Sequence, residues 1–487
     1  RYWRYQMKVT FTGYNRNETL TNFPVLVKLG PSIANFRYNQ FSSPNGYDLR
    51  FLDADGQELY YEFESWTNSG DSFVWVRVPE LSPGGDSIWA YWGNPSATTR
   101  RSYTTNGLTW YPYHAGVWHL GSTITGGKLP DSSTNFYHAT PFESTARNAI
   151  IGRGRWFDGS NDRLNMGDVL DPLFTPLEAR FTISLWYKPD QPVADKFLMA
   201  KYSALSENQR QWIFRIYMGS RPEFLWCGDL NASTYIGTRG YTQVTDTNKW
   251  YNLVATYDGM QLYTNRIKLY INGIPEGLTN DWITGTPASI PNGTAPLALA
   301  AQLNTAGSSS ANNLKGTLDE VRIMQTIPST NWFWASWLNV ASNSSFMTYY
   351  PVTSNLTVDV LSATRLTPTT ARLNGFLAHA GAGENPKCYF CWDTSDKGTT
   401  STALWWRVTY AGTNWNSGML FFKDITGLVP GTLYYCRAYV SSSKGTDWSD
   451  SYVTFRAVIL PTVVNNGAQS VRRHSAVLTG NITSTGY

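Results

Sequence analysis

Two adjacent carboxylates, Asp319 and Glu320, lie within the segment KGTLDEVRI, residues 315–323. The alternation of apolar and polar residues in this segment predicts a β-strand. Carboxylates are uncommon inside strands. Three roles are open for this pair: catalytic acids, metal ligands, or structural polar groups.

Strand parity separates the two carboxylates. Asp319 has the parity of Val321 and Ile323, which we expect to face the core, so Asp319 is predicted to be buried. Glu320 has the parity of Arg322 and is predicted to form a surface ion pair with it. A buried carboxylate without partners is costly, so Asp319 needs backbone donors or a cation.

The composition of the chain indicates a secreted, β-rich protein. Its 487 residues are enough for three or four domains. Charged residues are 15% and aromatic residues 15%, with 21 Trp and 30 Tyr. The net charge of +4 is spread along the chain and favours no nucleic-acid partner. No apolar run approaches the roughly 18 residues of a transmembrane helix, so we expect no membrane span. The composition predicts a secreted or cell-surface location.

Strand patterns dominate the whole chain. Segments such as FPVLVKLG and SFVWVRVPEL alternate with period two and are separated by Asn-Gly, Asp-Gly and Pro-Gly turns. The predicted fold class is all-β, with tandem antiparallel β-sandwiches. One helix is predicted in STNWFWASWLN, residues 329–339, with Ser329 or Thr330 as its N-cap and with Trp334 and Leu338 on one face.

The first unit is predicted to span residues 1–97, followed by a linker over 98–114. Its motifs NGYDLRF (45–51), FVWVRVPEL (73–81) and WAYWGNPSA (89–97) resemble a domain of unknown function found in large bacterial and archaeal surface proteins. That family usually precedes a laminin-G-like domain. The resemblance implies no activity.

The second unit is predicted to span residues 115–351. The ordered series GVWHLG, DSSTN, WFDGSNDRLNMG, FTISLWYKPD, WYNLVATYDG, IKLYINGIPEG and GTLDEVRI resembles the laminin-G-like branch of the concanavalin A-like lectin/glucanase fold. This resemblance implies a jelly-roll-like sandwich. The many short strands with hairpin turns indicate a two-sheet antiparallel sandwich independently.

The third unit is predicted to span residues 355–457. In GLVPGTLYYCRAYV, the spacing of Leu428, Pro430 and Tyr434 resembles the tyrosine corner of a fibronectin type III-like sandwich. Tyr434 is therefore predicted to be a structural residue whose hydroxyl bonds back to the turn.

An internal repeat extends this third unit. Residues 358–381 align without a gap to residues 463–486, at an offset of 105 residues. Residues 458–487 are therefore predicted to be the incomplete start of a second fibronectin-like repeat. Two strands cannot bury a core, so something must complete that sheet. The side chains predicted to need burial are Val471, Ala476, Leu478 and Ile482.

The cysteines are predicted to be structural. Cys388 and Cys391 form a C-x-x-C, but no second pair completes a zinc site. Cys436 either pairs with one of them or all three are buried free thiols.

The resemblance to laminin-G-like domains also implies a structural calcium ion, because relatives often hold one. Calcium takes carboxylate and carbonyl oxygens. The predicted ligands are Asp131 and Asn135 of the DSSTN loop, with Asp319 as the third contributor. The simpler interpretation is that Asp131 shapes an Asx-turn.

Catalysis is not expected. Glucanases of this fold carry E-x-D-x-x-E, which places two carboxylates on one strand face, and the motif is absent. The nearest segment is ELYYEFE, with Glu58, Glu62 and Glu64, in a hairpin strand of the first unit. There is also no G-x-S-x-G, phosphate-binding glycine loop or H-E-x-x-H.

The predicted function is non-catalytic adhesion or recognition of a glycan or a surface protein. The alternative is a structural subunit of an extracellular filament or sheath, which would bind copies of itself. A polysaccharide hydrolase is the third possibility. A sugar would stack on an exposed ring, and LWWRV places Trp405 and Trp406 on opposite faces, so one of them is predicted to be exposed.

Overall fold

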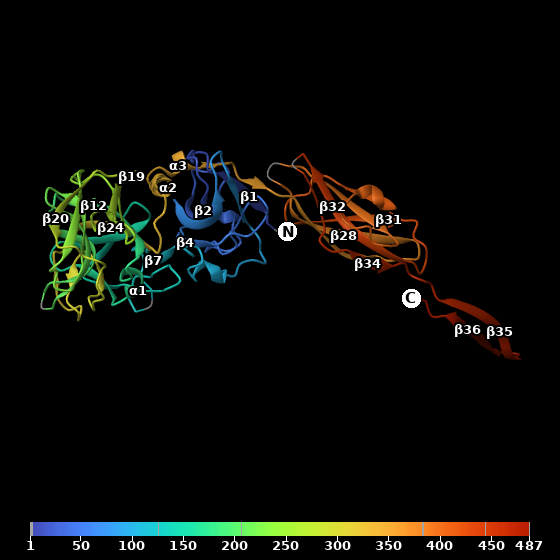
Figure 1. Cartoon of the computed structure of the whole chain (residues 1–487). Helices are drawn as coiled ribbons and strands as arrows, with labels where there is room; N and C mark the ends of the chain where they lie inside the picture. The colour runs from blue at the N-terminus through green and yellow to red at the C-terminus, as the bar shows by residue number, and fades with distance from the viewer. Residues whose placement is uncertain (1–2, 125, 206, 382–383, 444, 487) are drawn as a thin grey trace.

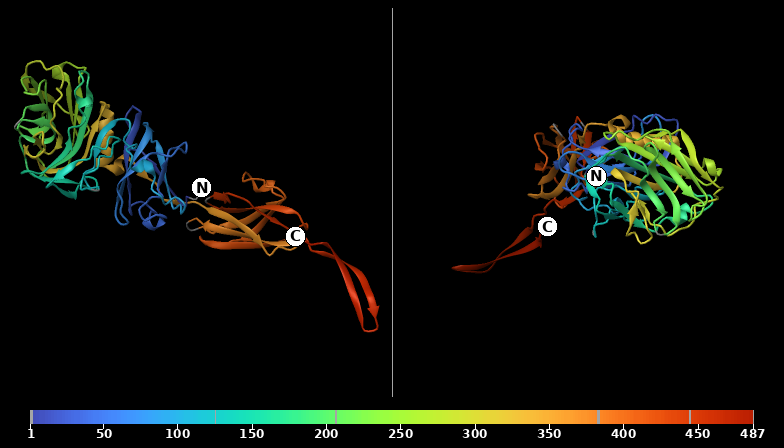
Figure 2. Two further views of the ribbon diagram at one scale, coloured as in Figure 1. Left: turned by 90° about the horizontal axis from the view of Figure 1, so that it is seen from below. Right: turned by 90° about the vertical axis from the view of Figure 1, so that its left-hand side faces the viewer.

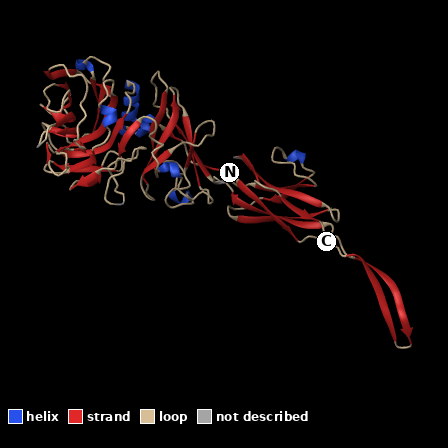
Figure 3. Cartoon of the chain, turned by 60° about the horizontal axis from the view of Figure 1, so that its bottom comes forward, coloured by secondary structure: helices blue, strands red, loops and turns tan. Residues whose placement is uncertain are grey.

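The protein consists of antiparallel β-sandwiches, as a computed structural model of the chain shows (Figures 1 and 3). The structure describes residues 3–124, 126–205, 207–381, 384–443 and 445–486. Three sandwich units lie in a row, and a two-stranded hairpin follows the third (Figure 2). The first unit lies between the second and the third, so the order in space differs from the order in the sequence. The all-β fold class is confirmed.

The first unit packs two sheets. The order of one is β2-β5-β4, and that of the other is β25-β1-β6-β3, with β26 also paired to β1. The strands are β1 Tyr5–Thr10, β2 Leu20–Leu29, β3 Arg50–Leu52, β4 Tyr61–Ser65, β5 Ser72–Leu81, β6 Ser87–Trp92, β25 Thr348–Tyr349 and β26 Thr353–Ser354. Two 3-10 helices, η1 Tyr38–Gln40 and η2 Ser102–Thr104, lie in its loops.

The second unit packs two eight-stranded sheets. The β24 sheet has the order β19-β18-β17-β12-β24-β10-β9, with β7 also paired to β24. Its strands are β7 His114–Trp118, β9 Thr145–Asn148, β10 Arg153–Asp158, β12 Arg180–Pro189, β17 Tyr251–Asp258, β18 Ile267–Ile271, β19 Ile274–Pro275 and β24 Lys315–Met324.

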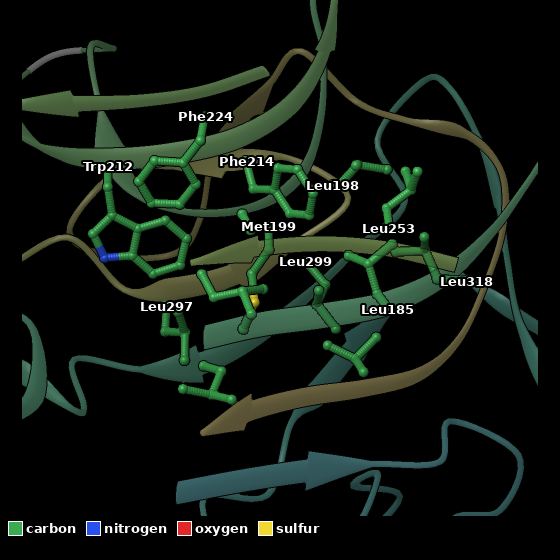
Figure 4. Close-up of a cluster of buried hydrophobic side chains, with 14 of the residues drawn as sticks. Leu185, Leu198, Met199, Trp212, Phe214, Phe224, Leu253, Leu297, Leu299 and Leu318 are labelled. Carbon is green, nitrogen blue, oxygen red and sulfur yellow. The ribbon is translucent and has the colours of Figure 1, made fainter. Parts of the chain in front are cut away.

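The opposing β14 sheet has the order β20-β16-β15-β14-β13-β21-β11-β8. Its strands are β8 Thr140–Phe142, β11 Arg163–Gly167, β13 Lys196–Ser203, β14 Gln209–Tyr217, β15 Arg221–Cys227, β16 Tyr235–Gly240, β20 Leu278–Thr284 and β21 Leu297–Leu299. The small elements between strands are α1 Asp171–Phe174, η3 Tyr263–Asn265, β22 Gln302–Leu303 and β23 Ser310–Ala311. The inner faces of the two sheets form the largest core, where Leu185 and Leu318 of the β24 sheet oppose Trp212 of the β14 sheet (Figure 4).

Residues 330–354 lie within or just after the range predicted for the second unit, yet they complete the core of the first. Helix α2 spans Thr330–Ala341, α3 spans Asn343–Phe346, and β25 and β26 follow. Ser329 caps α2 by accepting the backbone N–H of Trp332. The residues from this segment in the first unit's core are Trp332, Phe333, Ala335, Phe346, Met347 and Val352.

The most buried residues of α2 are not Trp334 and Leu338, the pair predicted to share one face. Trp332, Phe333, Ala335 and Asn339 are buried, whereas Trp334 and Leu338 are only half-buried. Two neighbours determine which residues of α2 are buried, because the helix packs between the first unit and the β24 sheet. Tyr270 of β18 belongs to the same cluster and contacts the ring of Phe333 at 4.6 Å between centroids.

The third unit is a smaller sandwich. Its sheets have the orders β27-β28-β31 and β30-β29-β32-β33, with β34 also paired to β32. The elements are β27 Thr357–Thr364, β28 Thr370–His379, β29 Lys387–Asp393, η4 Thr402–Leu404, β30 Arg407–Gly412, β31 Met419–Thr426, β32 Leu433–Ser442, β33 Gly445–Trp448 and β34 Val453–Arg456. Cys388, Cys391 and Cys436 are buried free thiols, so none of them forms a disulfide in the structure.

Tyr434 occupies the corner at the start of β32. Its ring is 1% exposed, and its hydroxyl accepts the backbone N–H of Val429 at 3.0 Å. Replacing Tyr434 by phenylalanine removes the acceptor and leaves this N–H without it. We expect the free energy of unfolding of the third unit to fall by about 1 kcal/mol or more. Denaturant unfolding of the chain, followed by a signal that comes from the third unit, would measure the loss. An unchanged transition would contradict this role for the hydroxyl.

The terminal hairpin consists of β35 Thr462–Arg472 and β36 Ser475–Ser484. Strand β36 begins and ends 105 residues after β28, and the pair Val463↔Ile482 repeats the pair Val358↔Leu377 at the same offset. The hairpin therefore has the strands and register of the opening hairpin of the third unit. The four side chains predicted to need burial are exposed, with Leu478 at 81%. In the described part of the chain, no helix is long and apolar enough to cross a bilayer.

Candidate functional site

Strand β24 contains a bulge at the two carboxylates. Ser184 of β12 pairs with Arg322 and Trp186 pairs with Asp319, so β24 has one extra residue between these pairs. Glu320 has a positive φ of 49°, which is uncommon for a non-glycine residue. Such an insertion changes which face the following side chains take.

The bulge overturns the parity argument. Leu318, Val321 and Ile323 face the core of the second unit, whereas Asp319 and Arg322 lie on the opposite face of the sheet. Asp319 is buried as predicted, but not in that core. Glu320 is not a surface residue, because its side chain is 1% exposed.

This opposite face of the β24 sheet packs against the β2-β5-β4 sheet of the first unit. A small apolar cluster lies between them, formed by Leu26, Trp75, Trp110, Val117 and Ile151. Helix α2 closes one side, where Asn339 Oδ1 accepts the backbone N–H of Leu26 at 3.2 Å. The two units therefore share a buried junction, and we call them together the head.

A group of charged side chains lies in this junction. The junction cluster consists of Glu62 and Glu64 from β4, His119 directly after β7, and Asp319, Glu320 and Arg322 from β24. Glu62 and Glu64 alternate with Tyr61 and Phe63, whose rings face the first unit's core, so both carboxylates point toward the second unit.

Glu320 is the centre of the cluster. Its Oε1 lies 2.6 Å from His119 Nδ1, and its Oε2 accepts Arg322 Nη2 at 2.5 Å. The Arg322 guanidinium lies over the rings of Trp75 and Trp110, at 4.3 and 4.6 Å from their centroids. This cation is thus held by one carboxylate and two aromatic faces.

Glu64 approaches the same ring nitrogen of His119 as Glu320 does, whereas Glu62 approaches the other nitrogen. Glu64 Oε2 accepts the indole N–H of Trp75 at 2.7 Å and lies 3.6 Å from His119 Nδ1. Glu62 accepts the indole N–H of Trp110 at 2.6 Å, and its Oε1 lies 3.8 Å from His119 Nε2. His119 Nε2 is buried without a hydrogen-bond partner.

Burial and mutual charge separate the pKa values of these groups. Burial, with the charge of Glu320, raises the pKa of Glu64 well above its usual value, and the same two causes raise the pKa of Asp319. For Glu320, burial raises the pKa, but His119 and Arg322 outweigh it and bring the pKa to about 2. Burial lowers the pKa of His119, but Glu320 and Glu64 outweigh it and hold that pKa well above its usual value.

A cleft of about 390 Å³ opens onto the cluster. Glu62, Glu64 and His119 form one wall. The other lining residues are Phe63, Arg100, Thr104, Thr105, Leu120, Ser122, Ile124, Pro130, Asp131, Ser132, Phe136 and His138. The predicted linker 98–114 therefore contributes to the cleft, and the cluster is reached from solvent at Glu62, Glu64 and His119.

The cluster brings two carboxylates together, as a retaining glycosidase requires. Glu64 and Glu320 even have pKa values displaced in opposite directions, which is typical of an acid and a nucleophile. However, Glu320 does not line the cleft, and both of its oxygens are bonded within the protein. A sugar in the cleft has no access to it, so the geometry favours a binding role over hydrolysis.

The three predicted calcium ligands are used differently. Asp131 Oδ1 accepts the backbone N–H groups of Val117 and Ser133, and Oδ2 accepts Tyr137 N–H and the Ser133 hydroxyl. Asn135 donates its amide to the carbonyl of Ala115. Asp319 accepts the backbone N–H groups of Ile151 and Glu320. The carboxylate oxygens of Asp131 and Asp319 are directed at protein donors, so these two side chains do not fit a calcium ion in this arrangement, and calcium stays a prediction.

Sequence reasoning did not connect Glu64, His119 and Glu320. Glu64 was considered as part of ELYYEFE, and His119 occurs in GVWHLG, but no local spacing links them to Glu320, which is 201 residues after His119. A signal was present in the sequence of β4, where Glu62 and Glu64 alternate with two aromatic residues. This alternation places both carboxylates on the face of the strand opposite the aromatic rings.

A second candidate site lies on the outer face of the β14 sheet. This aromatic pocket has a volume of about 310 Å³ and is lined by Tyr202, Arg210, Arg215, Tyr217, Leu225, Ala232, Tyr235 and Trp282. Trp282 of β20 is 40% exposed. The Arg215 guanidinium lies over the Tyr217 ring at 3.7 Å and is bonded to Glu223 and Asp195, which keeps the pocket wall in place.

Trp186 and Trp392 are buried and offer no ring to a ligand. Trp250 is only half-buried. Trp405 is buried while Trp406 is 50% exposed, as their opposite parity predicted.

Family comparisons agree with both resemblances in the head. Residues 158–332 match the family model described as the concanavalin A-like lectin/glucanases superfamily, and residues 45–108 match the domain of unknown function DUF2341. No curated protein matches the chain significantly.

Three solved structures illustrate the structural likeness. The binding domain of Paraclostridial Mosquitocidal Protein 1 is 11% identical, with 71% of this chain and 91% of that chain covered and a TM-score of 0.35. The botulinum neurotoxin serotype C1 binding domain is 10% identical, with 76% and 79% covered and a TM-score of 0.34. The Ruminococcus gnavus IT-sialidase CBM40, bound to α2,3-sialyllactose, is 13% identical, with 40% and 97% covered and a TM-score of 0.27. TM-scores this low carry no functional argument.

Proposed function

We propose that the chain is a non-catalytic, extracellular or cell-surface protein whose second unit binds a glycan in the aromatic pocket. The observation that carries this proposal is an open pocket with three tyrosine rings and a partly exposed Trp282 around it. Ligand sites are concave and combine apolar or aromatic walls with a few polar groups. Aromatic faces suit the C–H faces of sugar rings, and the guanidinium groups suit sugar hydroxyls or carboxylates.

The row of units supports this role as an adhesive protein. We assign the third unit as fibronectin type III-like on its two-sheet order and on the Tyr434 corner. It lies at the far side of the first unit from the pocket-bearing second unit (Figures 1 and 2). In this proposal the third unit acts as a spacer that holds the pocket-bearing second unit away from the cell surface on which the protein is displayed.

The test is a glycan-array screen with the full chain, followed by calorimetric titration of the glycan bound best. Replacing Trp282 by alanine removes the exposed stacking surface, and we expect affinity to fall about tenfold or more, since roughly 1.4 kcal/mol corresponds to a factor of ten. Trp406, a ring on the third unit that is 50% exposed, provides the control, and Trp406→Ala is expected to bind unchanged.

Two results would contradict the proposal. Absence of binding to every glycan class would remove it, and full affinity in Trp282→Ala would place any glycan elsewhere. Glycans recovered after incubation are expected to be intact. Cleavage lost in Glu64→Gln would instead favour a hydrolase.

A filament or sheath subunit is the second candidate. The observation in its favour is the exposed apolar surface of the terminal hairpin, including Val463 and Leu478. A neighbouring copy that adds strands to this hairpin would cover these side chains. Concentration-dependent growth of assemblies in sedimentation velocity would support it, and a monomer at all concentrations would contradict it.

A further inference from the structure

The junction cluster has more acidic than basic side chains. Four carboxylates, those of Glu62, Glu64, Asp319 and Glu320, share the junction with Arg322 and His119. Buried carboxylates are expensive unless each is paired, protonated or bound to a metal. The protein groups of the cluster therefore leave room for additional positive charge.

The donor atoms already lie where one ion would bring them. An oxygen of Glu64, a ring nitrogen of His119 and an oxygen of Glu320 all lie within 4.8 Å of one another. His119 Nδ1 is 3.6 Å from Glu64 Oε2 and 2.6 Å from Glu320 Oε1. Bonds of about 2.0–2.2 Å in a tetrahedral site separate neighbouring ligand atoms by roughly 3.3–3.6 Å, so only small shifts are needed.

The unpartnered nitrogen of His119 points to the same ligand. The side chain is 9% exposed, and its Nε2 has no hydrogen-bond partner. Histidines that bind a metal through one nitrogen usually donate the other N–H to a carboxylate. Here Glu62 Oε1 lies 3.8 Å from Nε2, close enough to become that acceptor once Nδ1 binds an ion.

We propose that Glu64, His119 and Glu320 bind one divalent transition-metal ion, such as Zn²⁺ or Mn²⁺, in the junction of the head. Mixed imidazole and carboxylate donors suit these ions. The ion enters from the cleft, which Glu64 and His119 line, and its remaining coordination position faces that cleft. Coordination through Nδ1 displaces the proton now between Nδ1 and Glu320, which leaves to solvent.

The ion would fasten the two units of the head together. Glu64 comes from the first unit, whereas His119 and Glu320 come from the second. Because the ion binds only to the docked arrangement, it stabilises that arrangement by a free energy that grows with the logarithm of the ion concentration. The site differs from the aromatic pocket, so glycan binding and metal binding can fail independently.

The test uses the untagged full chain after chelation and dialysis. We expect calorimetric titration with ZnCl₂ or MnCl₂ to show one ion per chain, with a release of protons that differs between buffers of different ionisation enthalpy. The melting temperature of the head should rise with the ion and fall back when a chelator is added. Titration with CaCl₂ and MgCl₂ is expected to give weaker binding, because a nitrogen ligand disfavours these ions.

Three variants make the test specific. Glu64→Gln keeps an oxygen for the Trp75 N–H but loses the charge, and its affinity should fall at least a hundredfold. Glu62→Gln should weaken binding about 10–100-fold by removing the outer carboxylate. Glu178→Gln, at an exposed position, should bind like the wild type.

The proposal is wrong if the chelated wild type takes up neither ion in a one-to-one ratio. It is also wrong if Glu64→Gln, shown by its melting curve to be folded, binds as tightly as the wild type.

Discussion

Replacing Arg322 by methionine is expected to destabilise the head by about 3–5 kcal/mol, because it leaves buried carboxylates without their permanent cation. Arg322 donates to Glu320, and its guanidinium lies over two tryptophan rings. Methionine fills part of the same volume beside the rings, so the loss measured is chiefly that of the charge and its hydrogen bond. Chemical denaturation followed by tryptophan fluorescence would measure the effect.

The control for Arg322 is Arg180 on the neighbouring strand β12. Its Nε lies 3.4 Å from Asp258, and its side chain is half exposed, so solvent screens the pair. Arg180→Met should cost less than about 1 kcal/mol. Equally small losses of stability in Arg322→Met and Arg180→Met would show that the stability of the head does not depend on the Arg322 guanidinium.

The first unit is expected not to fold without residues 330–354. A fragment of residues 1–114 lacks the aromatic rings of Trp332, Phe333 and Phe346, and its strand β1 loses both β25 and β26. Removing one large aromatic side chain from a core costs about 3–5 kcal/mol, whereas a whole domain is stable by only about 5–15 kcal/mol. Three missing rings therefore cost about 9–15 kcal/mol, which is as much as the whole stability of a domain.

The measurement compares fragments 1–114 and 1–356. The longer fragment contains the complete head and should show dispersed amide resonances and cooperative thermal unfolding. The shorter one should show neither. A dispersed spectrum and a sharp transition for residues 1–114 would mean that the helix and the two short strands are accessory to the first unit rather than part of it.

Local patterns predicted several features well. The cap of α2 at Ser329 and the Tyr434 corner each depend on residues fewer than six positions apart, so sequence spacing is sufficient to find them. The hairpin β35–β36 follows from a gap-free alignment to β27–β28. In these cases the interacting groups are neighbours in the chain, and the physical constraint is local.

The residues of the candidate sites could not be found from local sequence patterns. Trp282 lies in no distinctive motif. It lines the pocket only because β20 pairs with β16, which places Trp282 beside Tyr235 and the other lining residues of the β14 sheet. The buried face of α2 depends on two neighbouring units, so helical periodicity alone could not choose between Trp332 and Trp334.

The sequence by itself determined the all-β class, the succession of sandwich units and the repeat at the end, because period-two alternation and turn residues act over a few positions. Only the tertiary structure decided what Asp319 and Glu320 do. One extra residue in β24 reverses the face taken by Asp319 relative to Val321, and a bulge depends on pairing with other strands. The meeting of Glu320 with His119 and Glu64 depends in turn on how two units pack, which no periodic pattern within either unit encodes.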